Sequence, residues 1–567
     1  MKLLSIFTIG ITTMFMVSCS LVKDFTYTVN PNPAEMHGDS VKLTIAVNVP
    51  EKGIRKNVRA EITPKIGNTT FGTWTIQGEK VTGNGSTVLF KPGGTTTFEM
   101  VVPYSDDMAA SSITISGKVF KGLKEKKSLP ELKIADATII TPLMVKKEFE
   151  MIFEDDNYKF EETKFKNVTI NFDRGQSFVK DSELNSQNMK EFTNWLSTVQ
   201  ANPKITITSI NITGYASPDG VENRNQSLSQ QRTETVRSAF INIMKKAKLI
   251  SHSNNSNYVL DPKGEDFIGF EDELSKTNSI PQDQKDLIMR IIQMNTDLDK
   301  RENAIKDIGK TWVELEKDVF PKIRRANIVV NYIEKGLTKE EITQALQNNT
   351  SILSIEQLLY AGKNIAKDLN QKVKIYELAT SNFSSDYRAH NNLGAALFDQ
   401  NRMSDAKNSF EKANSIKDNA SSKNNLAGVA LLNGNKAQAI KLMAQTKSVD
   451  AKNSSIVAYN NAILNIIAGE YSKAESNLKD NSFNKALSLT LQGKLPQATI
   501  VLNAIPTTPE SFYLKAIVAA RSGESVDAVV TNLKQAFAKD SNLKTKASKD
   551  REFIKFMNDA IFTAAVN

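Results

Sequence analysis

Residues 214–232 (GYASPDGVENRNQSLSQQR) are the part of this chain best suited to bind a small charged ligand. They follow a β-like run of alternating isoleucines and lead into an amphipathic helix that begins near Gln226. On such a helix Arg232 can bind a carboxylate through the planar fork of its guanidinium group. Backbone N–H groups at the start of the helix can add further donors. In isolation, an arginine at this place most simply forms a salt bridge on the helix surface. The residue types alone therefore predict a loop–helix junction with a cation that an anionic group could use.

This stretch resembles the signature of the OmpA-like domain, the module by which many Gram-negative envelope proteins hold peptidoglycan. The family pattern is roughly G-[YH]-T-D-x-x-G followed by N-x-x-L-S-x-x-R-A. The residues in register with it are Gly214, Tyr215, Gly220, Asn225, Leu228, Ser229 and Arg232. The sequence departs from the pattern at Ala216-Ser217, which stand where threonine and aspartate are expected.

The resemblance implies that an aspartate and Arg232 bracket diaminopimelate, a zwitterion of the peptidoglycan stem peptide, while Asn225 steadies the loop. Ser217 has no negative charge for the ammonium group, and the lost charge-assisted bond is worth about 1.5–3 kcal/mol. Asp219 is close enough in sequence to reach the site, although Pro218 biases the loop toward a different shape. The candidate peptidoglycan-binding residues are Arg232, Asn225, Ser217, Asp219 and Tyr215.

Three interpretations of this signature stay open. The domain retains peptidoglycan binding, with weaker affinity or a different stem-peptide preference. Alternatively it has lost the ligand and serves as a scaffold, or it binds a different small ligand.

No second constellation points to catalysis or to a metal site. The three histidines, His37, His252 and His390, are far apart in sequence, and Cys19 is the only cysteine, so no zinc-ligand spacing is present. The sequence contains no nucleophile elbow, phosphate-binding loop or catalytic triad. We therefore expect neither an enzyme nor a protein that needs a cofactor or a metal.

The first residues predict the compartment. A positively charged start and a short apolar run end in Met16-Val17-Ser18-Cys19, which resembles a lipobox. The resemblance implies a lipoprotein signal peptide over residues 1–18 and a lipid-modified Cys19, whose several acyl chains anchor a protein stably. Residues 20–24 lack the acidic cluster of surface-exported Bacteroidota lipoproteins. We therefore expect an outer-membrane lipoprotein that faces the periplasm.

The overall composition is that of a globular protein of about three or four domains. The formal net charge of +9 over 567 residues comes from scattered lysines rather than from an arginine-rich block. This surplus favours a solvated surface, with at most weak attraction to anionic polymers or phospholipid. Nucleic acid is not an expected partner, because no basic motif is interleaved with aromatic residues.

The first part of the chain is expected to contain two domains joined by a linker. Residues 19–148 show short strand-like runs separated by Gly and Pro turns, which predicts a β-sandwich. This region resembles the β-domain found ahead of OmpA-like modules in Bacteroidota envelope proteins. Residues 149–165 are expected to be a linker, and residues 166–336 an α+β OmpA-like domain. A helical insertion at about 249–320 is expected to precede its last strand.

Residues 337–567 are expected to be all-helical repeats. A G-x-x-x-x-A marker, or a close variant, occurs at Asn401/Ala406, Gly434/Ala439, Gly469/Ala474, Gly493/Ala498 and Gly523/Ala528. This marker resembles that of tetratricopeptide repeats. Such units bury their apolar faces only by stacking, which predicts a solenoid with a groove for protein or peptide partners.

Together these features favour an outer-membrane lipoprotein that links the membrane to peptidoglycan and offers its repeats to unidentified envelope proteins. One alternative is a non-wall-binding scaffold or assembly factor of a secretion or surface-structure system. A second alternative is a surface adhesin led by the β-domain.

Overall fold

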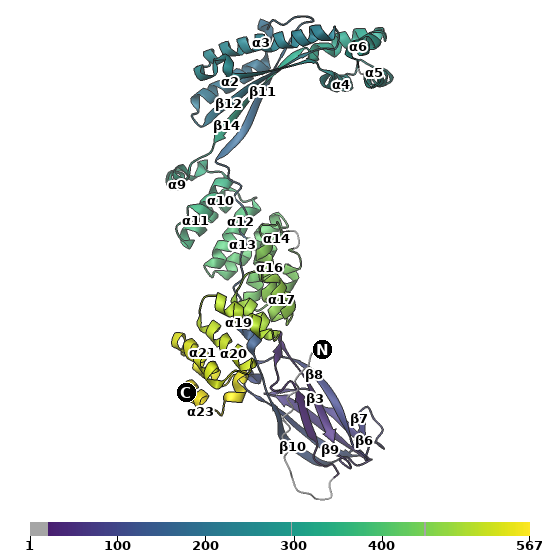
Figure 1. Ribbon diagram of the computed structural model, residues 1–567, viewed down its shortest axis with the longest axis vertical. Helices are drawn as coiled ribbons and strands as arrows, with labels where there is room; N and C mark the ends of the chain where they lie inside the picture. Colours follow the sequence, from purple (N-terminus) through teal and green to yellow (C-terminus); the bar gives the residue numbers. More distant parts are fainter. Residues whose placement is uncertain (1–20, 296, 447–448) are drawn as a thin grey trace. The chain divides into compact units, whose positions relative to one another are not determined.

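The computed structural model describes residues 21–295, 297–446 and 449–567 (Figure 1). Cys19, the expected lipidation site, lies outside the described residues. The chain divides into two compact units. The first combines the residues before 156 with residues 366–567, and the second is formed by residues 156–365. The second unit is therefore inserted into the sequence of the first, whose two stretches are held together by contacts between them.

Two mostly antiparallel sheets share one core at the start of the first unit. The first sheet contains β1 (Thr26–Asn30), β2 (Met36–His37), β3 (Ser40–Val49) and β8 (Gly94–Pro103). The second contains β4 (Val58–Ile66), β5 (Thr69–Thr70), β6 (Trp74–Gly78), β7 (Ser86–Val88), β9 (Ser112–Lys121) and β10 (Lys124–Asp136). Val41, Leu43 and Ile45 alternate along β3 and are at most 1% exposed in this core. The expectation of a sheet-rich N-terminal region is confirmed.

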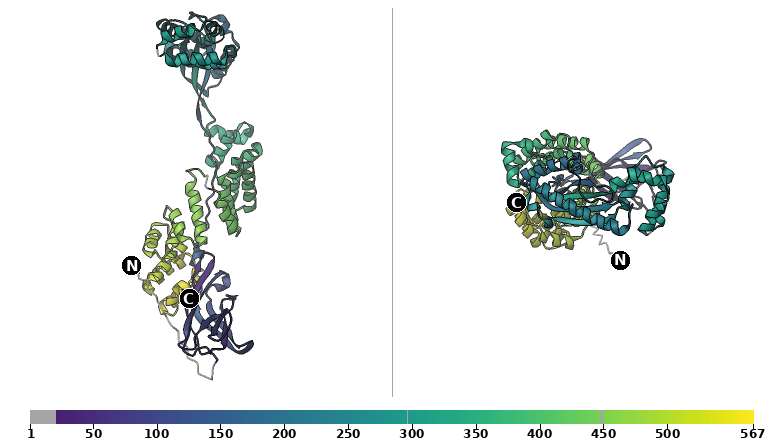
Figure 2. Two further views of the ribbon diagram at one scale, coloured as in Figure 1. Left: turned by 90° about the vertical axis from the view of Figure 1, so that its right-hand side faces the viewer. Right: turned by 90° about the horizontal axis from the view of Figure 1, so that it is seen from above.

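Residues 366–567 form a helical repeat region, as expected (Figure 2). Its α-helices are α11 (Leu369–Asn382), α12 (Tyr387–Asp399), α13 (Met403–Ile416), α14 (Ala420–Leu432), α15 (Lys436–Met443), α16 (Ser454–Ile467), α17 (Tyr471–Asn477), α18 (Phe483–Leu491), α19 (Leu495–Ala504), α20 (Pro509–Arg521), α21 (Val526–Lys539), α22 (Leu543–Ala547) and α23 (Ala560–Val566).

The repeat markers have a direct physical explanation. Each marker Gly or Asn, for example Gly434 at φ 79°, adopts a positive φ in the turn between two helices, a conformation that glycine and asparagine tolerate. The alanines that follow are fully buried in the first four repeats, and Ala528 is half-buried in the fifth. A Cβ atom on Gly394 would lie 2.6 Å from the ring of Phe410, so α12 and α13 pack closely only because this residue is glycine.

A four-stranded sheet in the order β11-β14-β12-β13 organises the second unit. Its strands are β11 (Glu161–Asn171), β12 (Ile205–Ala216), β13 (Tyr258–Glu265) and β14 (Arg325–Lys335). Its packed helices are α2 (Gln187–Ala201) and α3 (Glu222–Lys246), which contribute Phe192 and Phe240 to the core of the sheet. The pairing of β12 with β14 shifts register between Ile207 and Ser209, where the sequence pattern also slips.

The segment expected as a helical insertion differs from the expectation in one respect. It contains β13, which pairs parallel with β12, so the inserted helices begin only at Phe267. They are α4 (Phe267–Lys276), α5 (Gln282–Met294), α6 (Leu298–Lys306), α7 (Lys310–Asp318) and α8 (Phe320–Ile323), which form their own core. The apolar run of β13 is only three residues long and is followed by Asp261, Pro262 and Lys263, so its strand pattern is weak.

The boundaries of the second unit also differ from the expected domain limits. It includes α9 (Lys339–Asn348) and α10 (Ile355–Asn364), which the sequence pattern groups with the repeats, and a short α1 (Asp181–Leu184). Short 3-10 helices occur in both units at Asp106–Met108, Thr141–Met144, Ile250–His252, Asn255–Asn257, Thr350–Ile352 and Arg551–Phe556. No helix in the described part of the chain is both long and apolar enough to cross a membrane.

Candidate functional site

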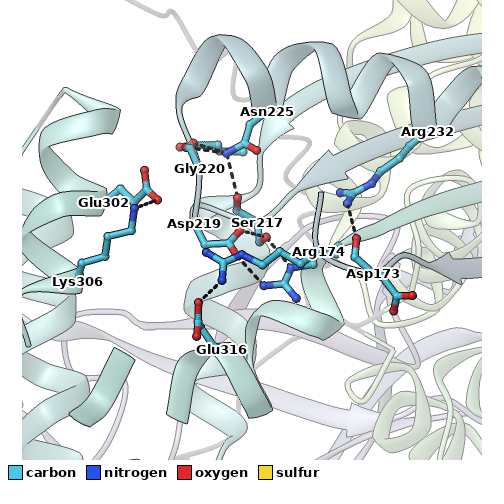
Figure 3. A network of polar contacts seen from close by, with 12 residues as sticks. Asp173, Arg174, Ser217, Asp219, Gly220, Asn225, Arg232, Glu302, Lys306 and Glu316 are labelled. Carbon is cyan, nitrogen blue, oxygen red and sulfur yellow. Dashed lines mark hydrogen bonds and ion pairs between the residues drawn. The ribbon is translucent and has the colours of Figure 1, made fainter. Parts of the chain in front are cut away.

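The signature residues gather where β12 ends and α3 begins (Figure 3). Gly214 is required there, because a Cβ atom would lie 2.5 Å from the backbone oxygen of Ser229 on α3. Ser229 in turn accepts a hydrogen bond from the N–H of Gly264 through its hydroxyl group, at 3.0 Å. These two signature residues therefore fix α3 against β12 and β13, and they position the loop between β12 and α3.

Arg232 points into the protein rather than toward solvent and is fully buried. Its Nε donates to the backbone oxygen of Gln176 at 3.0 Å and its Nη1 to that of Tyr215 at 2.6 Å. A longer bond of 3.4 Å joins Nη2 to the backbone oxygen of Asp173, and the guanidinium lies over the ring of Phe172. Burial lowers the pKa of Arg232 to about 10, so the group stays charged at neutral pH.

Ser217 and Asp219 form one internal network with two arginines (Figure 3). The Ser217 hydroxyl donates to the Asp219 carboxylate and accepts a bond from Nε of Arg324 at 3.0 Å. Nη2 of Arg324 lies 2.6 Å from Oδ2 of Asp219, and Nε of Arg174 lies 3.2 Å from the same atom. The Asp219 side chain is only 6% exposed, whereas that of Arg174 is 56% exposed. Asp219 thus brings a carboxylate beside Ser217, and both arginines neutralise it.

The amide group of Asn225 holds the two ends of the loop between β12 and α3 together. Its Nδ2 lies within 3.1 Å of three acceptors, the backbone oxygens of Ser217 and Gly220 and Oε1 of Glu265. Tyr215, the remaining candidate, is half-buried, and its ring lies under the guanidinium of Arg325 at 5.0 Å. The structure therefore brings all five candidates together, but it uses them in internal contacts.

Glu265 is a polar residue of this junction that the signature does not include. Burial raises its pKa to about 7, and the nearby carboxylates of Glu302, Glu222 and Asp299 add to the effect. The bond from Asn225 opposes the shift. Its Oε2 has no hydrogen-bond partner among the described residues. Within the described ranges, no group of three or more histidine, cysteine, aspartate or glutamate side chains could hold a metal ion.

A second set of polar residues lies on one face of the repeat region, formed by α12, α14, α16 and α18. Four asparagines there bind an extended segment of the same chain, residues 146–154, which we call the strap. Each amide side chain accepts from the N–H and donates to the C=O of one strap residue, at 2.7–3.0 Å. The pairs are Asn484 with Lys146, Asn460 with Glu150, Asn425 with Ile152 and Asn392 with Glu154.

Further contacts make the strap part of the repeat core. The four asparagines that bind the strap form what we call the asparagine ladder. Asn391 and Asn424 add bonds to the backbone oxygens of Ile152 and Glu150 and link neighbouring asparagines of the ladder. Phe149 is 6% exposed within the repeat core. A Cβ atom on Gly428 would lie 2.7 Å from its ring, so this glycine makes room for the strap. Residues 149–155 of the expected linker therefore belong to the packed first unit.

The ladder could have been found from the repeat spacing. Each of its four asparagines precedes a marker alanine by the same interval, in the pairs Asn392/Ala406, Asn425/Ala439, Asn460/Ala474 and Asn484/Ala498. In the fifth repeat the equivalent residue is Leu514, which is fully buried. A polar residue at a fixed position of a packed helix indicates a buried partner.

Comparisons with known proteins give little further information. No protein-family model matches the sequence, and no curated protein is similar to it. A crystal structure of a tetratricopeptide repeat protein from Parabacteroides merdae ATCC 43184 is 14% identical in sequence, with a TM-score of 0.28. The match covers 40% of this chain and 91% of that protein. This similarity is too weak to assign a function.

Proposed function

We propose that the protein is a non-enzymatic, lipid-anchored scaffold of the bacterial outer membrane that faces the periplasm. In this proposal residues 166–336 form an OmpA-like domain that does not hold peptidoglycan through the family clamp. The observation that carries the proposal is the complete burial of Arg232. Its guanidinium group, which a stem-peptide carboxylate would need, already binds the backbone oxygens of Gln176 and of Tyr215 in β12.

Hydrogen-bond energies favour the observed arrangement, in which Arg232 binds backbone oxygens, over one in which it binds a carboxylate. A carboxylate would have to displace Arg232 from the oxygens of Gln176 and Tyr215. Each buried acceptor left without a partner costs about 1–3 kcal/mol. The new charge-assisted bonds are worth about 1.5–3 kcal/mol each, so the exchange yields little or nothing. The binding of diaminopimelate at this arginine is therefore not favoured.

The first unit supports a role as a scaffold. The strap fills the face that α12, α14, α16 and α18 present, so this face is not open to a partner peptide. The same unit joins the N-terminal sheets to the repeats through Arg521, which lies 2.5 Å from Glu35 and 2.6 Å from Glu552. Unidentified envelope proteins would therefore bind other faces of this unit, as assembly partners of a secretion or surface-structure system.

The sacculus-binding test uses the chain that begins at Ser20, which keeps every described residue. Purified peptidoglycan sacculi are sedimented with this protein at low salt. We expect no protein in the pellet beyond the amount that sediments alone. Binding to sacculi that free diaminopimelate competes away would overturn the proposal. The lipid anchor is tested separately, by incorporation of labelled palmitate in the native chain and its loss in Cys19→Ala.

One observation favours peptidoglycan binding as a second candidate function. Asp219 brings a carboxylate beside Ser217, close to where the family has its aspartate. If the exposed Arg174 moves away, a ligand ammonium can take its place at Asp219, while Arg324 stays paired. This candidate predicts that Arg174→Ala strengthens sacculus binding and that Asp219→Asn abolishes it. The first proposal predicts that neither variant binds.

A further inference from the structure

The N-terminal sheets have two ends with different surroundings. One end packs on the repeats, where the N–H of Gly38 donates to the hydroxyl of Tyr471 at 3.2 Å. Arg551 donates to the backbone oxygen of Ala110 at 2.8 Å at the same end. The opposite end makes no such contact with the repeats among the described residues, and we call it the free end.

The described chain begins at the free end. The N–H of Arg55 donates to the backbone oxygen of Leu21, and Val22 forms a β-bridge with Ile54. A turn then leads to Val58, which pairs with Lys121 at the tip of the β9–β10 hairpin. The hairpin tip, the loop over residues 50–57 and the first described residues therefore lie together.

The loop over residues 79–93 completes the free end. The N–H of Lys52 donates to the backbone oxygen of Phe90, and the N–H of Lys80 donates to that of Lys56, both at 2.7 Å. This loop contributes Leu89, which is 52% exposed.

Lysines dominate the surface of the free end. Its exposed lysines are Lys23, Lys52, Lys56, Lys80, Lys91, Lys121 and Lys124. The nearby carboxylates of Glu51 and Glu79 offset part of this charge, because they lie within 3.9 Å of Lys52, Lys56 and Lys91. In the described residues Lys80, Lys121 and Lys124 have no ion pair with a carboxylate.

Exposed leucines lie among these lysines. Leu123 stands at the hairpin tip between Lys121 and Lys124 and is 95% exposed, and Leu89 belongs to the same end. An exposed apolar residue flanked by basic ones is the composition of a surface that rests on an anionic bilayer. A soluble polyanion would explain the lysines but not the leucines.

We propose that the free end binds the anionic phospholipid surface of the membrane to which the protein is anchored. The inference rests on the proposed lipid at Cys19 for its location in the cell. Cys19 precedes Leu21 by two residues, which span at most about 7 Å. An acyl chain there places the free end within about one Debye length, ~8–10 Å, of the lipid headgroups. The lysines then attract anionic lipid, and Leu123 enters the interface.

Vesicle flotation tests the proposal with the unlipidated chain that begins at Ser20. Vesicles of phosphatidylcholine alone are compared with vesicles that also contain phosphatidylglycerol. We expect binding only to the second kind, weakened by added salt. Each lysine near an anionic surface contributes about five-fold to the affinity, so Lys121→Glu with Lys124→Glu should reduce binding by at least roughly 25-fold.

Two further variants separate the parts of this surface. Leu123→Ser should reduce binding by roughly ten-fold, as expected for one leucine buried in the interface. Lys539→Glu with Lys544→Glu carries the same charge change on exposed residues of the repeats and serves as the matched control. It should bind as the native chain does. Thermal unfolding of each variant is measured alongside, and flotation is compared only below the unfolding transition.

Three results would overturn the inference. They are equal binding to both kinds of vesicle, no binding to either at low salt, and equal losses in the hairpin variant and the control. Because this chain lacks Cys19, failure here leaves palmitate labelling and sacculus sedimentation unaffected. In the same way, a negative result in palmitate labelling or sacculus sedimentation does not change what vesicle flotation measures.

Discussion

Asn425→Ala should release the strap from the repeat region. Asn425 makes four hydrogen bonds in a site with no exposed surface. Its Oδ1 accepts from the N–H of Ile152 at 2.8 Å and from Nδ2 of Asn424 at 3.1 Å. Its Nδ2 donates to the C=O of Ile152 at 2.8 Å and to Oδ1 of Asn391 at 3.1 Å. Asn391 also donates to the C=O of Ile152, so the alanine variant leaves mainly the buried N–H of Ile152 without a partner.

The size of the effect can be worked out from these bonds. Four bonds at about 1 kcal/mol each give a loss of about 4 kcal/mol, and one buried N–H without a partner costs about 1–3 kcal/mol. We take a value between these two estimates, about 3 kcal/mol. Since local opening sets the rate of amide exchange, the backbone amides of residues 149–154 should exchange roughly 100-fold faster in the variant.

Hydrogen exchange followed by mass spectrometry measures this change peptide by peptide. Asn481→Ala, at an exposed position of the same region, is the matched control and should leave the strap protected. The reasoning is refuted if strap exchange in Asn425→Ala equals that of the control. It is also refuted if exchange rises equally throughout the repeats, because the ladder would then have no specific hold on the strap.

Three other predictions follow from single sites. Gly428→Val should lower the midpoint of urea unfolding of the first unit, because its side chain would overlap the ring of Phe149; overpacking of this kind costs about 1–3 kcal/mol. Asp219→Asn should destabilise the second unit by about 3–5 kcal/mol in the same assay, since Arg324 stays buried without its carboxylate. Glu265→Gln should change the dependence of stability on pH. Burial raises the pKa of Glu265 to about 7 from 4.5, so its stabilising effect is complete below pH 4.5 and is lost as the pH rises through 7. The glutamine variant should therefore be more stable than the native chain above pH 7, relative to their difference at pH 4.5.

Each of these predictions has its own contradicting result. An unchanged midpoint of urea unfolding in Gly428→Val would mean that the site beside Phe149 has room for a larger side chain. A stability loss below 1 kcal/mol in Asp219→Asn would mean that water already solvates Arg324. Parallel stability profiles for native chain and Glu265→Gln would mean that Glu265 titrates normally. Glu234→Gln, on the exposed side of α3, is the matched control for that profile.

Local patterns in the sequence predicted the elements that depend on local chemistry. The alternation of Val41, Leu43 and Ile45 marks β3 because one face of that strand is buried. The positive-φ turns at residues such as Gly434 mark the repeats because each turn has the same geometry. The resemblance of residues 214–232 to a family signature also located the loop–helix junction.

The parts that could not be predicted depend on long-range contacts. The strap lies more than 230 residues from its asparagines, so no local pattern distinguishes it from a linker. The strand β13 is held by its pairing with β12 rather than by its own alternation. Register with a family motif places Arg232 in the site but does not reveal which way its guanidinium points. That direction depends on the backbone oxygens of Gln176 and Tyr215, from two other segments.

The central claim is that the signature site is closed to the peptidoglycan stem peptide. The most direct test is calorimetric titration of the chain that begins at Ser20 with a diaminopimelate-containing stem peptide. We predict no saturable heat of binding, because Arg232 has no exposed surface and stays bonded to the backbone. Saturable one-to-one binding that is lost in Arg232→Lys, with the fold of the variant intact, would contradict the claim.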